Sequence, residues 1–262
     1  RNSLALLVDA FPVADPTSSK DDFDSAMQRN FTAIYRLLAD TSPAVRAAAA
    51  QGTCRILSSF WELVPAATTK RLLARVAGDC ARDAASVAVR AAAVDGVAFL
   101  LDQVLAHPLL ASLLPAMSPL VHDRSERVRS SVLQMLLKVQ CLRSIRLYDV
   151  VPADDIMARI VLDAGTASTR PALIRLLAPS FLPPGASASD LITRVVRCMR
   201  RHPAAGVAFF ANAGLATTAQ ERTRLALVLH KALVRSVESA ASGKKAGALD
   251  ARNEVLMAHL TA

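Results

Sequence analysis

An aspartate followed six or seven residues later by an arginine occurs four times at regular intervals along this chain. The pairs are Asp40 and Arg46, Asp83 and Arg90, Asp123 and Arg129, and Asp163 and Arg170. A carboxylate and a guanidinium group form charge-assisted hydrogen bonds, which are shorter and stronger than those between neutral groups. This pattern therefore indicates a repeated structural ion pair rather than a catalytic site.

One dipeptide could instead belong to an enzyme. His122-Asp123 is the dipeptide of metal-dependent phosphohydrolases, and His107 and Asp163 could supply further ligands. However, Asp123 and Asp163 already belong to the repeated pattern. The chain has no HExxH, GxSxG or P-loop motif and no clustered Cys and His set. We therefore expect no metal ion, no cofactor and no catalysis, and a polar pocket around His122 would revive the enzyme hypothesis.

A basic helix face is predicted near residues 188–201. At 100° per residue, four arginines fall within one arc of about 120°: Arg194, Arg197, Arg200 and Arg201. The opposite side is apolar, with Leu191, Ile192, Val195, Val196, Cys198 and Met199. Such a face suits a phosphate backbone, without base specificity, or an acidic peptide. The alternative is a solvated face that has no partner.

The next predicted helix, near 219–238, carries a weaker basic face. Arg224, Lys231 and Arg235 lie on one side of it, and Glu238 partly offsets their charge. These seven cations are the candidate residues for contact with DNA or with an acidic partner chain.

The elements that position these residues follow from the repeat length. The arginines of the pattern are 39 to 44 residues apart, the length of a two-helix repeat that stacks into a solenoid. The aspartates fall at the turn between the two helices, where a carboxylate can cap the second helix or accept hydrogen bonds from turn amides. Each arginine, one turn into the second helix, could reach the aspartate of its own or the adjacent repeat. We predict an all-α fold, an α-solenoid of stacked helical hairpins, with these eight residues as a structural ladder.

Three segments are predicted along the chain. Residues 1–22 form the end of a preceding helix and a loop, residues 23–185 form four repeats, and residues 186–262 form further helical hairpins with a Gly/Lys loop near 242–247. The second helix of the first repeat is expected over residues 43–59. The start at Arg1-Asn2-Ser3, with no methionine or signal peptide, suggests a piece of a longer polypeptide.

Composition agrees with a binding protein. Lysine and arginine number 31 against 22 acidic residues, a net charge of +9, which indicates an acidic partner or a bias in genome composition. The sequence contains no run of about 18 uninterrupted apolar residues, so we predict no transmembrane helix. Four cysteines, Cys54, Cys80, Cys141 and Cys198, fall in predicted helices, and we expect them to be small buried residues in a reducing compartment.

The Asp…Val-Arg turn resembles that of the HEAT-repeat family. Longer strings in the same order are similar to the HEAT-repeat G subunits of condensin II, over about residues 4–235. They include residues 52–58, 61–67, 107–110, 113–116, 122–123, 125–126, 128–129, 135–138, 180–183 and 203–205. The last 25 or so residues show no such similarity.

This resemblance implies a chromosome-organising role in the nucleus during mitosis. Condensin II joins two SMC ATPases to a kleisin chain and two HEAT-repeat subunits. Its G subunit binds the kleisin, holds double-stranded DNA with it, and does not hydrolyse ATP. The matching strings are mainly turn and core positions, so the resemblance transfers no individual contact residue. The alternative is another HEAT-repeat scaffold, such as a phosphatase scaffold or a nuclear transport receptor, although the latter usually has an acidic inner face.

Overall fold

The computed structural model describes residues 2–13, 15, 17, 19–163 and 165–241, and all regular elements within these residues are helical. The predicted all-α class is confirmed for this part of the chain. The chain divides into two compact units, Arg1–Val151 (unit 1) and Pro152–Ala262 (unit 2). The boundary between them falls inside the segment 23–185 that was predicted to hold four repeats.

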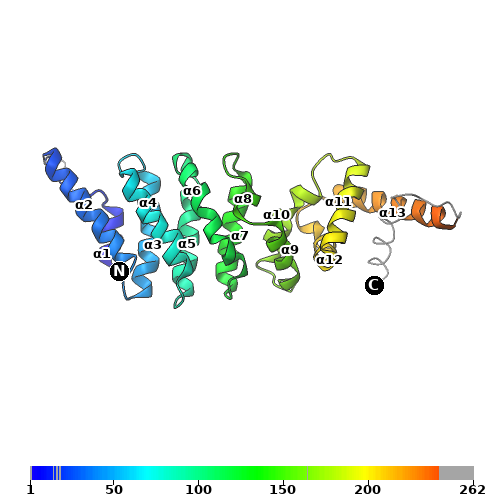
Figure 1. The fold of residues 1–262 in the computed structure, drawn as a ribbon, viewed down its shortest axis with the longest axis horizontal. Helices are drawn as coiled ribbons and strands as arrows, with labels where there is room; N and C mark the ends of the chain where they lie inside the picture. Colours follow the sequence, from blue (N-terminus) through cyan, green and yellow to red (C-terminus); the bar gives the residue numbers. More distant parts are fainter. Residues whose placement is uncertain (1, 14, 16, 18, 164, 242–262) are drawn as a thin grey trace. The chain divides into compact units, whose positions relative to one another are not determined.

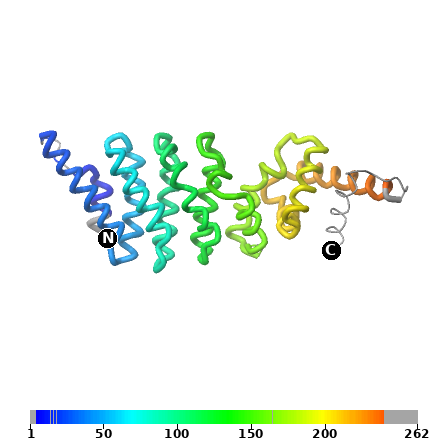
Figure 2. Tube along the Cα trace, in the orientation of Figure 1, coloured from blue at the N-terminus to red at the C-terminus, as the bar shows by residue number. Residues whose placement is uncertain are grey.

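Unit 1 is a row of helical hairpins. Its α-helices are α1 (Asn2–Asp9), α2 (Lys20–Leu37), α3 (Pro43–Ser59), α4 (Ala66–Ala74), α5 (Val87–Leu100), α6 (His107–Leu113), α7 (Glu126–Cys141) and α8 (Leu147–Val150). Shorter 3-10 or π segments adjoin α4 and α6: η1 (Arg75–Asp79), η2 (Cys80–Arg82), η3 (Val104–Ala106) and η4 (Leu114–His122). Within unit 1, α5 packs against α3 on one side and α7 on the other, as Figures 1 and 2 show.

Local sequence signals account for where these helices begin and bend. Helix α3 spans Pro43–Ser59, as predicted, with Pro43 in its first turn, where the missing N–H costs nothing. Ser86 caps α5 by accepting a hydrogen bond from the Val89 N–H at 3.4 Å. Pro115 stands where α6 gives way to the 3-10 segment η4, because proline cannot continue the α-helical hydrogen bonds.

The interface between α3 and α5 depends on small side chains. Ala50 and Ala93 are fully buried, with relative exposures of 0%. A Cβ atom added at Gly96 would lie 3.0 Å from Cys54 Sγ and 3.2 Å from the Ala50 carbonyl oxygen. The two helices therefore approach so closely that a side chain at position 96 would require its neighbours to shift by a few tenths of an ångström.

Unit 2 contains shorter hairpins. Its helices are α9 (Ala153–Leu162), α10 (Arg170–Phe181), α11 (Ala188–Arg201), α12 (Pro203–Ala211), η5 (Ala213–Leu215) and α13 (Ala219–Ala241). The predicted helix 188–201 is confirmed: Ser187 caps α11 by accepting from the Asp190 N–H at 3.1 Å, and the next helix starts at Pro203. Helix α13 extends three residues beyond the predicted 219–238, and the predicted loop at 242–247 lies outside the described residues.

One helical stretch, Val104–His122, is long and apolar enough to cross a membrane by length and composition alone. In unit 1 it is the first arm of a hairpin whose second arm is α7, and it is broken into η3, α6 and η4. Leu110, Leu114 and Met117 are almost fully buried against the unit. Core packing therefore accounts for the apolar residues in the middle of this stretch, whereas Val104 and Leu105 at its start are exposed.

The expectation for the cysteines needs one correction. Cys54, Cys80 and Cys198 are buried, but Cys141 is exposed at the end of α7. Burial raises the pKa of Cys54 to about 12, with a smaller contribution from Cys80, and burial also raises the pKa of Cys198 to about 11. Cys141 escapes burial because the last turn of α7 lies where the connection to α8 leaves the helix.

Candidate functional site

The aspartates of the repeated pattern lie in the turns between helices and bind turn amides. Their Oδ1 atoms accept hydrogen bonds from nearby backbone N–H groups: Asp40 from Ser42 at 2.7 Å, Asp83 from Ser86 at 2.8 Å, and Asp123 from Ser125 at 2.8 Å. The N-cap positions of α3, α5 and α7 are held by these serines. Each carboxylate thus organises its turn, and the Oδ2 atoms of Asp83 and Asp123 also accept hydrogen bonds from the neighbouring hairpin.

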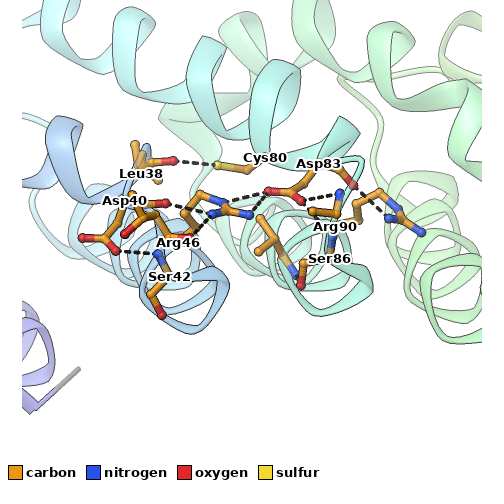
Figure 3. Close-up of polar contacts among 11 residues, drawn as sticks. Leu38, Asp40, Ser42, Arg46, Cys80, Asp83, Ser86 and Arg90 are labelled. Atoms are coloured by element: carbon orange, nitrogen blue, oxygen red, sulfur yellow. Dashed lines mark hydrogen bonds and ion pairs between the residues drawn. The ribbon is translucent and has the colours of Figure 1, made fainter.

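The arginines connect consecutive turns in unit 1. Arg46 donates from Nε to Asp83 Oδ2 at 2.8 Å and from Nη1 to the Asp40 carbonyl oxygen at 2.8 Å (Figure 3). Arg90 repeats the arrangement, with Nε 2.7 Å from Asp123 Oδ2, Nη2 2.9 Å from Oδ1, and Nη1 2.9 Å from the Asp83 carbonyl oxygen. Each of these two guanidinium groups therefore bridges the carbonyl of its own turn and the carboxylate of the next one.

The second of these pairs is nearly dry. The Arg90 side chain is 13% exposed and that of Asp123 is 7% exposed. Burial alone would raise the pKa of Asp123, but hydrogen bonds from Arg90 and the Ser125 N–H, with the charges of Arg90 and Arg129, outweigh it. The pKa of Asp123 consequently lies below its usual value, so the carboxylate stays ionised at neutral pH.

The third copy repeats the bonds to the carbonyl oxygens of its own turn, and Asp163 of the fourth copy is held by a threonine and an arginine. Arg129, 9% exposed, donates from Nη1 to the carbonyl oxygens of Asp123 and Arg124 at 3.0 and 3.2 Å. Asp163, 1% exposed, accepts from Thr169 Oγ1 at 2.9 Å and forms an ion pair with Arg159. Arg159 was not predicted, although it lies in α9 four residues before Asp163, the C-cap of that helix, and this spacing is a recognisable signal. Arg170 is the first residue of α10.

Three of the four residues in the enzyme hypothesis, His107, Asp123 and Asp163, have other hydrogen-bond partners. His107 is buried, with Nε2 2.9 Å from the Leu101 carbonyl oxygen and Nδ1 2.7 Å from Ser144 Oγ. Asp123 and Asp163 hold the bonds described above. Within the described ranges, no group of three or more His, Cys, Asp or Glu side chains is arranged to hold a metal ion.

Helix α11 presents its arginines unequally. Arg194 is half-buried and bonds Asp190 Oδ2 at 2.9 Å and the Ser180 carbonyl oxygen at 2.7 Å. Arg201 donates to Asp154 Oδ2 at 2.6 Å, and this hydrogen bond lowers the pKa of Asp154. Arg197 and Arg200 are exposed and form no hydrogen bond or ion pair with any described residue.

The two free arginines flank a shallow depression on α11. Thr193, Val196 and Arg201 complete its lining. The predicted stripe of four guanidinium groups is therefore reduced to an exposed pair, with Arg201 beside it in an exposed ion pair. Sequence reasoning overlooked Asp154, which lies 47 residues from Arg201 in the chain.

Helix α13 mixes cations with apolar side chains. Arg224 donates to the Ala186 carbonyl oxygen, whereas Lys231 and Arg235 are exposed without a described partner. Leu227 and Val234, on the same side of the helix, are 55% and 41% exposed. The opposite side packs on α11, where Leu225, Leu229 and Leu233 lie against Val195, Val196 and Met199. This shared core fixes which faces of α11 and α13 point outward.

Comparison with known proteins finds one recurrent relative. The chain is 34% identical over 232 residues to "Condensin-2 complex subunit G2" of Xenopus laevis, covering 88% of this chain and 20% of that protein. It is 34% identical over 239 residues to the protein of that name in Homo sapiens, covering 91% of this chain and 21% of the relative, and 33% identical to that of Danio rerio over the same shares.

Two other comparisons give no match. No family model matches the chain, and no solved structure matches it. The chain spans about a fifth of the length of the curated relatives that it matches. Identity of about one third, sustained over nine tenths of the chain in vertebrate proteins of one name, makes this chain a homologue of a segment of the condensin II G subunit.

Proposed function

We propose that this chain is a HEAT-repeat scaffold segment of a condensin II regulatory subunit, without chemistry of its own. In this proposal it holds the kleisin chain and adds basic surface to double-stranded DNA, and it meets the SMC ATPases through the complex. Its place would be on chromosomes in the nucleus, during mitotic condensation. The hairpins of unit 1, joined by the bridging arginines Arg46 and Arg90, support the HEAT assignment.

The observation that carries the DNA contact is the exposed, unpaired Arg197 and Arg200 on α11. Two free guanidinium groups about one helical turn apart can each neutralise a phosphate and release its counterions. Arg201, held by Asp154 in an exposed pair, can exchange its partner at small cost, because such pairs contribute little. Arg194 is tied to its own helix and is assigned no contact.

The α13 face is assigned to the kleisin. The exposed side chains of Leu227 and Val234 gain free energy only from a partner that covers them with apolar surface. A DNA duplex offers phosphates but little apolar surface. A peptide with apolar and acidic side chains satisfies these two residues together with Lys231 and Arg235. The face is therefore better matched by a polypeptide than by DNA.

Fluorescence anisotropy with labelled double-stranded DNA at several salt concentrations tests the DNA contact. The variant Arg197→Glu/Arg200→Glu should weaken binding at low salt and reduce the magnitude of the log–log salt slope by about 1.8, at roughly 0.9 per phosphate. Arg175→Glu, on an exposed residue of α10, is the control and should change binding much less. Equal loss in both variants would show that only overall charge matters.

A pull-down with the separately purified kleisin of condensin II tests the second contact. The variant Leu227→Asp/Val234→Asp should no longer bind the kleisin. Its affinity for DNA should be unchanged, because the proposed DNA contact lies on α11. Retention of the kleisin by this variant would exclude the α13 face. No capture by the unaltered chain would contradict the kleisin assignment itself.

A further inference from the structure

The two edges of unit 1 differ in chemical character. The turns within hairpins, at Asp40, Asp83 and Asp123, hold the bridging arginines, and we call this side the ladder edge. The connections between successive hairpins, residues 101–106 and 142–146, lie at the other ends of the long helices. At the ladder edge the polar groups satisfy one another, whereas at the connections large apolar side chains face solvent.

Three such side chains occur within seven residues. Phe99 is 47% exposed, Val104 is 70% exposed and Leu105 is 52% exposed, although Leu100 and Leu101 between them are buried. Single exposed apolar residues are ordinary, but a local cluster marks an interaction site. The structure gives no internal reason for these three residues to be apolar, since none contributes to the core.

The two connections are bonded to each other. Ser144 Oγ lies 2.7 Å from His107 Nδ1, and His107 Nε2 lies 2.9 Å from the Leu101 carbonyl oxygen. Lys138 Nζ bonds the Ala98 carbonyl oxygen at 3.0 Å and Asp102 Oδ2 at 2.9 Å. These bonds hold residues 98–107 beside residues 138–146, so a partner would meet a surface that is already ordered.

Unpaired cations accompany the apolar cluster. Arg143 and Arg146 are exposed and form no hydrogen bond or ion pair with any described residue. The charge of Asp102 is balanced by its ion pair with Lys138. Asp149, three residues after Arg146, is exposed and forms no ion pair with a described residue. A guanidinium group offers a planar fork that fits a carboxylate. The local excess of positive charge therefore favours an acidic partner.

We propose that Phe99, Val104, Leu105, Arg143 and Arg146, here named the connection edge, form a docking site for an extended acidic segment of a protein partner. A large apolar side chain of that segment covers Val104 and Leu105, and its carboxylates meet Arg143 and Arg146. A nucleic acid would satisfy the arginines but would leave the apolar cluster against water and phosphate. This site goes beyond the DNA and kleisin contacts proposed for unit 2.

The test uses the full chain and two fluorescent peptides. One peptide alternates leucine or phenylalanine with glutamate, and the other has lysine in place of glutamate. The chain should bind the glutamate peptide at least tenfold more tightly than the lysine peptide in anisotropy titrations. Val104→Ser/Leu105→Ser should weaken this binding at least tenfold, and Arg143→Glu/Arg146→Glu should abolish the preference for glutamate.

Matched controls lie at the ladder edge. Val87, 39% exposed, and the exposed Arg124 and Arg127 reproduce the same residue types beside the turns. Val87→Ser and Arg124→Glu/Arg127→Glu should leave peptide binding unchanged. Circular dichroism would establish that every variant is folded, as expected for substitutions of exposed residues.

Four outcomes would overturn the assignment: equal affinity for both peptides, no binding of either, equal effects of the control variants, or a different occupant. Sedimentation with phosphatidylserine vesicles that depends on Val104 and Leu105, without peptide binding, would make the surface a membrane contact. A dimer in light scattering that Val104→Ser/Leu105→Ser dissociates would make it a contact between copies of this chain.

Discussion

Arg90 and Asp123 illustrate how single residues hold this fold together. The guanidinium group makes two hydrogen bonds to the carboxylate and one to the Asp83 carbonyl oxygen, so it joins one turn to the next. The net stabilisation from a buried pair of this kind is small. Removal of one partner is nevertheless strongly destabilising, because it leaves the other charge buried without a partner.

Replacement of Arg90 by alanine is expected to lower the free energy of unfolding of unit 1 by about 3 to 5 kcal/mol. Urea denaturation followed by the fluorescence of Trp61, the single tryptophan, reports on this unit. Lys138→Ala is the control, since Lys138 and Asp102 are 45% and 64% exposed and such pairs contribute less than about 1 kcal/mol. Equal effects of the two substitutions would show that the buried pair has no special role.

The lowered pKa of Asp123 predicts a pH dependence. In the unfolded chain the pKa of an aspartate is about 3.9. Because the folded pKa is lower, the stabilisation is fully present above that value and is lost as the pH falls below it. The difference in unfolding free energy between the unaltered chain and Asp123→Asn should stay constant from pH 7 to 5 and shrink below about pH 4. Urea titrations at these pH values measure it, and a gap that closes already above pH 5 would contradict the assignment.

At the scale of elements, the closeness of α3 and α5 governs the geometry of unit 1. The interface is lined with alanine and with Gly96, whose added Cβ would press on Cys54 Sγ and the Ala50 carbonyl oxygen. A backbone oxygen cannot move aside as a flexible side chain can. The alanine-rich composition is therefore a requirement of helix approach at this interface, whatever its origin elsewhere in the chain.

Gly96→Val should destabilise unit 1 by about 1 to 3 kcal/mol through overpacking. Gly78→Ala is the matched control, because nothing lies within 4 Å of the added Cβ there. This control should be neutral or should stabilise by up to about 1 kcal/mol, since alanine favours helix over glycine. The Trp61 unfolding transition measures both variants, and a Gly96→Val variant as stable as the original would refute close packing.

At the scale of the whole molecule, the chain consists of two units with their own cores. Unit 1 buries Leu57, Leu73 and Leu100 completely, and unit 2 buries Leu173, Leu176 and Phe209. A core confined to one unit allows that unit to fold alone. The proposed contacts are divided between the units: those with DNA and the kleisin lie in unit 2, and the connection edge lies in unit 1.

Residues 1–151 produced alone should therefore show a cooperative urea transition by Trp61 fluorescence and a helical circular dichroism spectrum. The physical reason is that the burial of apolar side chains in unit 1 is supplied by its own helices. A non-cooperative transition, with helix content lost in proportion to urea, would show that unit 1 depends on the rest of the chain.

Much of the helical framework was predictable because its signals are local. Helices α3 and α11 have the predicted bounds, since proline and serine caps and the 3.6-residue apolar spacing act within a few residues. The pairing of Arg194 with Asp190, four residues apart, was also readable from the chain. The bond between Arg201 and Asp154 was not, because it joins two helices through residues that are 47 positions apart in sequence.

The sequence by itself determined the all-α class, the bounds of α3 and α11 and the turn aspartates, because each depends on residues that are neighbours along the chain. Only the tertiary structure decided which charges are used and which are free. Arg46 and Arg90 reach the next turn because their hairpins stack, and Arg197 and Arg200 pair with no carboxylate among the described residues. Partner choice across hairpins depends on packing geometry, and that geometry is a property of the folded chain rather than of any local stretch of it.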